Sequence, residues 1–88
     1  MTPLEAEIDK TAHMIVLLRN SLLRLATERD QTLRDVFRLV DAGEDVDLAY
    51  AGLRDVDGRI VAALRTLAQT HDTYKEVVWA LGTAPPGT

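Results

Sequence analysis

The 88-residue sequence contains no cysteine, one phenylalanine, one tryptophan, two tyrosines and only three prolines. The absence of cysteine excludes disulfides, thiolate zinc sites, iron–sulfur clusters and cysteine nucleophiles. The prolines are Pro3, Pro85 and Pro86, so no proline interrupts a helix anywhere between residues 4 and 84. The chain can therefore contain long helices, but it has few specialised chemical groups.

Long hydrophobic runs and excess positive charge are also absent. The longest apolar run is Met14–Leu18, far shorter than the roughly 20 residues that a membrane-spanning helix needs. The net charge of −4 is unfavourable for binding nucleic acids or anionic membranes. The acidic start, Met1–Glu5, lacks the basic segment of a signal peptide. We therefore expect a cytoplasmic protein with no membrane partner, and the charge disfavours a nucleic-acid partner.

Apolar residues in the first half repeat with the three-and-four spacing of a heptad. Thr2, Pro3 and Glu5 match a helix start, because a threonine cap and a glutamate three residues later form a capping box. Gly43 matches the glycine that follows a helix. The pattern predicts a helix over residues 3–42. The apolar positions that define it are Leu4, Ile8, Ile15, Leu18, Leu22 and Leu25.

The spacing changes in the middle of this predicted helix. Arg29 occupies the next heptad position, whereas Leu33, Phe37 and Val40 carry apolar side chains on a shifted face. This change predicts either a stutter in a continuous helix or a break near residues 26–31. We favour the continuous helix, because this segment contains good helix formers.

The second half repeats the heptad pattern. Asp47 can cap a helix and Gly82 can end it, which predicts a helix over residues 47–81. Gly58 is a weak point where this helix could divide in two, although the heptad phase runs through it. No segment alternates with period two, so we predict no strands. The positions predicted to face the first helix are Ala49, Leu53, Val56, Ile60, Leu64, Leu67, His71, Tyr74, Val78 and Leu81.

Together these elements predict an all-α fold, a long antiparallel helical hairpin with helices at about 3–42 and 47–81. Residues 1–82 form a single helical domain, and residues 83–88 form a flexible C-terminal tail. Two helices side by side bury one stripe each and leave the flanking apolar side chains in water. We therefore expect two hairpins to pair into a four-helix bundle dimer. The alternative is a compact monomer in which the first helix folds back on itself.

The residues predicted to form the interface lie in the half of the hairpin that contains both chain ends. There both helices are apolar nearly all round, and a helix that is apolar on every side is buried on every side. A tryptophan on a polar shoulder, such as Trp79, is typical of an interface anchor. A second copy or another protein is the expected partner. The predicted interface residues are Met14, Leu17, Leu18, Leu22, Val77, Val78, Trp79 and Leu81.

Few residues suggest chemistry. His71 is predicted to face the first helix, where it could act as a ligand or a pH switch, or as a hydrogen-bonded core histidine, which we favour. The acidic residues around Gly43 are interpreted as a solvated loop with capping roles. The sequence contains no Glu-x-x-His pair, so we expect no catalytic residue, metal or cofactor. The candidate ligand or switch residues are His71, Tyr74, Arg19 and Glu76.

These observations favour a non-catalytic protein–protein interaction or assembly module, such as an adaptor, an inhibitor or an assembly factor. One alternative is a small all-α enzyme or ligand-binding bundle with a pocket near His71. A less favoured alternative is a DNA-binding regulator, because the helix that would enter the groove is acidic and offers a single arginine.

Overall fold

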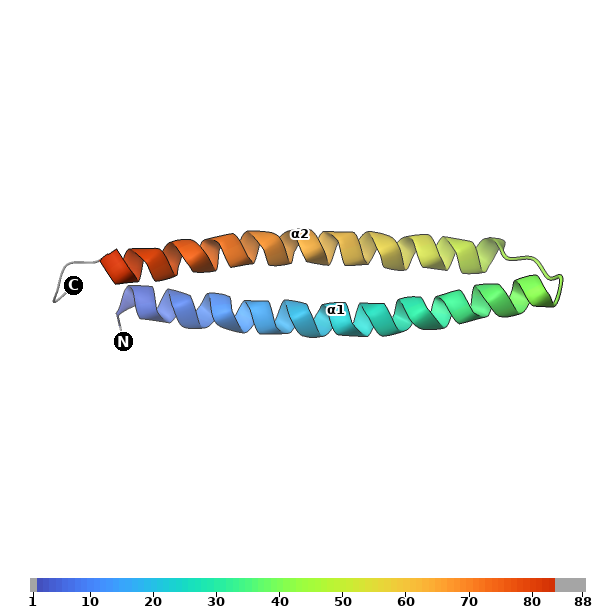
Figure 1. The fold of residues 1–88 in the computed structure, drawn as a ribbon, viewed down its shortest axis with the longest axis horizontal. Helices are drawn as coiled ribbons and strands as arrows, with labels where there is room; N and C mark the ends of the chain where they lie inside the picture. Colours follow the sequence, from blue (N-terminus) through green and yellow to red (C-terminus); the bar gives the residue numbers. More distant parts are fainter. Residues whose placement is uncertain (1, 84–88) are drawn as a thin grey trace.

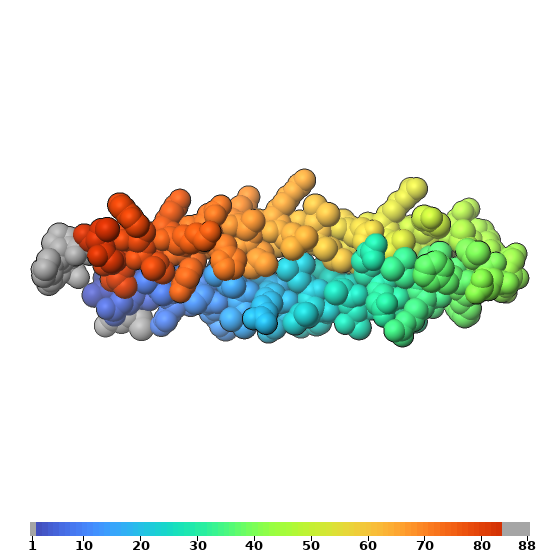
Figure 2. All heavy atoms as spheres, viewed as in Figure 1, coloured from blue at the N-terminus to red at the C-terminus, as the bar shows by residue number. Residues whose placement is uncertain are grey.

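The computed structural model describes residues 2–83, which form two long antiparallel α-helices that lie side by side (Figure 1). Helix α1 comprises Pro3–Asp41 and helix α2 comprises Asp47–Thr83. The molecule is a rod with extents of 69 × 16 × 13 Å, and Figure 2 shows the atoms of both helices in contact along its length. Residues 2–83 contain no strand, and neither helix divides. The predicted all-α hairpin with two continuous helices is confirmed.

The first helix begins and ends as its sequence predicts. The Thr2 hydroxyl accepts a hydrogen bond from the Glu5 N–H at 3.2 Å, and the Glu5 carboxylate accepts one from the Thr2 N–H at 3.4 Å. At the other end, Gly43 has a positive φ of 69°. The N–H groups of Gly43 and Glu44 donate to the carbonyls of Val40 and Leu39 at 3.1 and 2.9 Å. These two bonds form a Schellman motif, which satisfies carbonyls that the helix end leaves without partners.

The second helix differs from prediction at both ends. Asp47 is its first helical residue and not its cap. The Asp45 carboxylate accepts from the Asp47 N–H at 2.9 Å, so the aspartate two residues earlier performs the capping role. Gly82 lies inside the helix, which extends to Thr83. The rest of the predicted tail, residues 84–88, lies outside the described residues.

The two helices meet along one continuous heptad seam, the set of positions in each helix that faces the other helix. Every seam residue is buried or half-buried, and the spacing alternates between three and four without interruption. In α1 the seam comprises Leu4, Ile8, Thr11, Ile15, Leu18, Leu22, Leu25, Arg29, Thr32, Val36 and Leu39. In α2 it comprises Ala49, Leu53, Val56, Ile60, Ala63, Leu67, Thr70, Tyr74, Val77 and Leu81.

The predicted stutter in α1 is wrong. Arg29 stays in the seam, because its Nε donates to the Asp57 carboxylate at 2.6 Å. Thr32 also faces α2, where a Cβ added at Gly52 would lie 3.9 Å from the Thr32 methyl group, an ordinary van der Waals distance. The seam then continues through Val36, which is 7% exposed, whereas Phe37 is 63% exposed. A paired arginine and a half-buried threonine thus occupy the seam positions that lack large apolar side chains.

The predicted seam of α2 is wrong at three positions. His71, Leu64 and Val78 are exposed, and the residue before each of them faces α1 instead. Thr70, the residue before His71, is buried, and its hydroxyl donates to the Thr66 carbonyl of its own helix at 2.8 Å. This bond satisfies the buried hydroxyl without a partner from α1. The heptad spacing, and not the size of the side chain, therefore determines which residues of α2 face α1.

The position of the seam predicts opposite effects for two neighbouring residues. Val36→Ala should lower the free energy of unfolding by about 1–3 kcal/mol, since it leaves a cavity between the helices. Phe37→Ala should change it by less than about 0.5 kcal/mol in dilute, monomeric solution, because the ring is mostly in water. Urea unfolding followed by circular dichroism measures both values. A larger effect from Phe37→Ala would contradict the seam.

The turn predicts a second pair of opposite effects. Gly43→Ala should destabilise the hairpin by about 1–2 kcal/mol, because a Cβ disfavours the positive φ of this residue. Gly58→Ala is the matched control. Its added Cβ has no neighbour within 4 Å, and alanine should stabilise the middle of α2 by up to about 1 kcal/mol. The two changes in urea midpoint should have opposite signs, and equal signs would refute this account of the turn.

Candidate interaction surface

Helix α1 carries a second heptad stripe directly beside its seam. Each of its residues follows a seam residue by one position, and such a step rotates the side chain by about 100° around the helix. Most members are apolar, and most are exposed; Leu23 is 60% exposed. We call this set the α1 stripe. It comprises Ala12, Val16, Arg19, Leu23, Ala26, Asp30, Leu33, Phe37 and Val40.

Helix α2 carries a corresponding stripe, also one position after its seam. Tyr50, Val61, Leu64 and Val78 are its large exposed apolar members. Polar residues separate them near both ends, so the longest apolar stretch lies in the middle of the helix. The α2 stripe comprises Tyr50, Arg54, Asp57, Val61, Leu64, Ala68, His71, Lys75 and Val78.

Both stripes lie on the same side of the hairpin, which we call the apolar face. The helices run in opposite directions and their seams face each other, so a step toward the C-terminus turns both sets of side chains to one side. Residues one position before the seam must then share the other side, the polar face. Glu28 and Arg59 are two such residues, and their side chains meet at 2.7 Å. This contact agrees with the assignment of the faces.

The polar face is held by ion pairs across and along the helices. Arg59 lies 2.7 Å from Glu28 of the other helix and 3.1 Å from Asp55 of its own. The hydrogen bonds that Arg59 donates to Glu28 raise the pKa of its guanidinium. All three side chains are about half exposed or more, so each pair adds little stability. These charges make the polar face a solvated surface.

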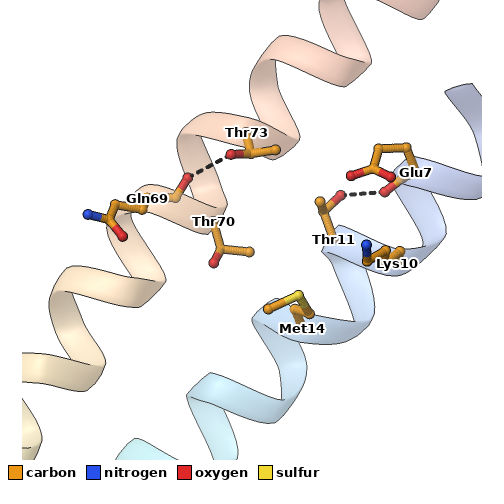
Figure 3. A pocket seen from close by; sticks show the side chains of 7 residues that line it. All are labelled: Glu7, Lys10, Thr11, Met14, Gln69, Thr70 and Thr73. Carbon is orange, nitrogen blue, oxygen red and sulfur yellow. Dashed lines mark hydrogen bonds between the residues drawn. The ribbon is translucent and has the colours of Figure 1, made fainter.

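A groove on the polar face offers little to a ligand. Its threonine hydroxyls are engaged by the backbone: Thr11 donates to the Glu7 carbonyl at 2.8 Å, and Thr73 donates to the Gln69 carbonyl at 3.1 Å (Figure 3). Within the described part of the chain, no buried side-chain nitrogen or oxygen lacks a hydrogen-bond partner. The groove is lined by Glu7, Lys10, Thr11, Met14, Gln69, Thr70 and Thr73.

The predicted interface residues do not share one surface. Four of them, Leu18, Leu22, Val77 and Leu81, are half-buried seam residues. Val78 belongs to the α2 stripe, and Met14 lines the groove on the polar face. Leu17 precedes the seam residue Leu18 by one position and is 51% exposed on the polar face. Trp79 is 71% exposed and lies midway between two seam positions, so it points away from α1.

The exposed apolar surface is also not confined to the half with the chain ends. Phe37, Val40, Leu48 and Tyr50 are exposed near the turn, and Leu48 is 90% exposed. Exposed apolar side chains therefore occur in both halves of the hairpin, because the α1 stripe runs from Ala12 to Val40.

The candidate ligand residues are spread over the rod. Arg19 and His71 are exposed on the apolar face, Tyr74 is half-buried in the seam, and Glu76 is exposed on the polar face. Across residues 2–83, no group of three or more histidine, aspartate or glutamate residues could hold a metal ion. Neither described helix combines the length and the apolar character needed to cross a membrane.

Comparison with known proteins identifies no relative, since no family, characterised sequence or solved structure matches this chain.

Trp79, the single tryptophan, provides a direct test of which surface associates. Because it points away from both α1 and the apolar face, its fluorescence should stay that of a water-exposed indole when the protein is concentrated. The emission maximum is measured across a range of protein concentrations that spans association. A blue shift that follows the increase in mass would show that Trp79 is itself an anchor between copies.

Proposed function

We propose that this protein is a non-catalytic interaction or assembly module that works through its apolar face. The observation that carries the proposal is the second heptad stripe of α1. Two adjacent apolar stripes are typical of a helix that packs against two neighbouring helices. In the hairpin α1 has only one such neighbour, α2. The proposed function is to supply half of a helical bundle.

The exposed area supports this proposal. A compact monomer of 9.7 kDa exposes about 5,100 Å², whereas the rod exposes 6552 Å². The excess of roughly 1,400 Å² is larger than the about 800 Å² that one partner contributes to a standard interface. The rod therefore has enough surface for a stable partner.

The assembly that the apolar face best fits is a four-helix bundle made of two hairpins. Two hairpins stacked through this face would cover Val16, Leu23 and Phe37 of α1 together with Val61 and Leu64 of α2. The polar faces, with their ion pairs, would remain in water on the outside of the bundle. Two copies give a homodimer, and another protein with a similar helical face would give a heteromeric bundle. An adaptor, an inhibitor or an assembly factor could work in either way.

One substitution on each side of α1 tests the proposed function. Leu23→Glu should raise the dissociation constant of the assembly about tenfold or more, because it places a carboxylate in the covered stripe. Leu17→Glu is the matched control, since Leu17 is similarly exposed but lies outside the apolar face. Sedimentation equilibrium measures the self-association of each variant. Equal weakening by both substitutions would argue against the apolar face as the binding surface.

A further inference from the structure

We propose that the apolar face binds the same face of a second copy in one fixed register. In this register α1 runs antiparallel to the partner's α1, and Arg19 pairs with the partner's Asp30. The inference rests on the proposed function and specifies its partner and geometry.

The two charges in the α1 stripe carry the argument. Arg19 and Asp30 interrupt a stripe that is otherwise apolar from Ala12 to Val40. Among the described residues, Arg19 forms no ion pair, and Asp30 pairs only with Arg34 one turn along its own helix, at 2.8 Å. Both side chains of that pair are more than half exposed, so Asp30 is open to a second partner. A covered stripe has to pair these charges, because an isolated buried charge is costly.

One two-fold axis can pair Arg19 and Asp30 of both copies at once. Arg19 and Asp30 lie at equal distances, in opposite directions, from the midpoint between residues 24 and 25. A two-fold axis through this midpoint, perpendicular to the helix, sets each Arg19 against the partner's Asp30. Two equivalent ion pairs result, as an isologous interface requires.

The same axis matches the apolar members of the stripe. It sets Leu23 against the partner's Ala26, Val16 against the partner's Leu33 and Ala12 against the partner's Phe37. Large side chains thus face small ones at two of the three levels, which favours close packing between helices.

Registers shifted by one heptad leave Arg19 and Asp30 without oppositely charged partners. A shift of one heptad toward the N-terminus sets Arg19 against the partner's Leu23, and a shift toward the C-terminus sets it against the partner's Phe37. Asp30 then faces an alanine in either case. Both alternatives set Arg19 and Asp30 against apolar side chains, whereas the proposed register pairs these two and leaves one charge, Asp9 just before the stripe, against the partner's Val40. Arg19 and Asp30 therefore favour the proposed register.

Helix α2 places apolar residues at the centre of this axis. The Glu28–Arg59 ion pair, at 2.7 Å, sets the level of α2 relative to α1. Because the helices are antiparallel, Val61 lies two residues beyond Arg59 and is level with Ala26. Leu64 lies five residues beyond Arg59 and is level with Leu23. The axis therefore also brings Val61 and Leu64 against the same two residues of the partner. The centre of the bundle would be apolar in all four helices.

Charge reversal tests the pairing. Arg19→Asp alone, or Asp30→Arg alone, sets like charges against each other twice in every dimer. Each should raise the dissociation constant at least about tenfold. An equimolar mixture of the two variants should recover dimers, because the mixed dimer restores two attractive pairs, and the double variant R19D/D30R should recover them too. Arg24→Asp is the matched control for charge, since Arg24 is exposed outside the apolar face.

Sedimentation equilibrium of these proteins separates the possible failures, with circular dichroism confirming that each variant is helical. If the single variants dimerise as tightly as the unaltered chain, the Arg19–Asp30 pairing is wrong, while Leu23→Glu still tests the apolar face. If the unaltered chain stays monomeric at high concentration, the second copy is wrong as the partner, while the apolar face can still bind another protein.

Cross-linking tests the direction of pairing independently, because the chain has no cysteine of its own. Ala12→Cys and Phe37→Cys chains should form a disulfide with each other when mixed and oxidised, but not each with itself. The two positions lie about 37 Å apart along one helix, so the bond must join different copies. A disulfide formed by each variant alone would show a parallel arrangement and overturn the register.

Discussion

The constraint behind this structure is that a hairpin gives each helix only one neighbour. Helix α1 has two apolar stripes, one position apart, and α2 covers only the first of them. Val36 on the covered seam is 7% exposed, whereas Phe37 on the next stripe is 63% exposed. Apolar surface in water is unfavourable in proportion to its area. In the proposed assembly, covering this stripe supplies the driving force.

The covered seam is itself thin. Val36 and Val56 are the buried apolar residues within residues 2–83, and the other two buried residues are threonines. The half-buried Arg29 occupies a further seam position and needs Asp57 as its partner. Such a seam gives a definite register but a modest hydrophobic core. Binding through the apolar face would add to stability by mass action, so folding and assembly are coupled in this account.

The sequence predicts the coarse fold well because its signals are local. The Thr2 cap with Glu5, the glycine at the turn and the heptad spacing each specify one helix end or one helix face. The phase of the seam is harder to predict, because both stripes of each helix have the same spacing. The spacing alone predicts Phe37, Leu64, His71 and Val78 in the seam or its continuation, whereas all four belong to the second stripes.

The deciding information lies in contacts between the helices. Arg29 lies in the seam with Asp57 of α2 as its partner, and Thr32 lies there beside Gly52 of α2. Neither contact can be recognised from one helix alone. The extent of the exposed apolar surface is hard to predict for the same reason, because the stripe from Ala12 to Val40 can be placed only once the seam is known.

Small-angle X-ray scattering of the unaltered protein tests the central claim most directly. Two hairpins stacked through their apolar faces should give twice the mass of the 9.7 kDa chain and a longest dimension close to the 69 Å of a single rod. The cross-section should be thicker than that of one hairpin. A single-chain mass at high concentration, or a doubled mass with a nearly doubled length, would contradict the account.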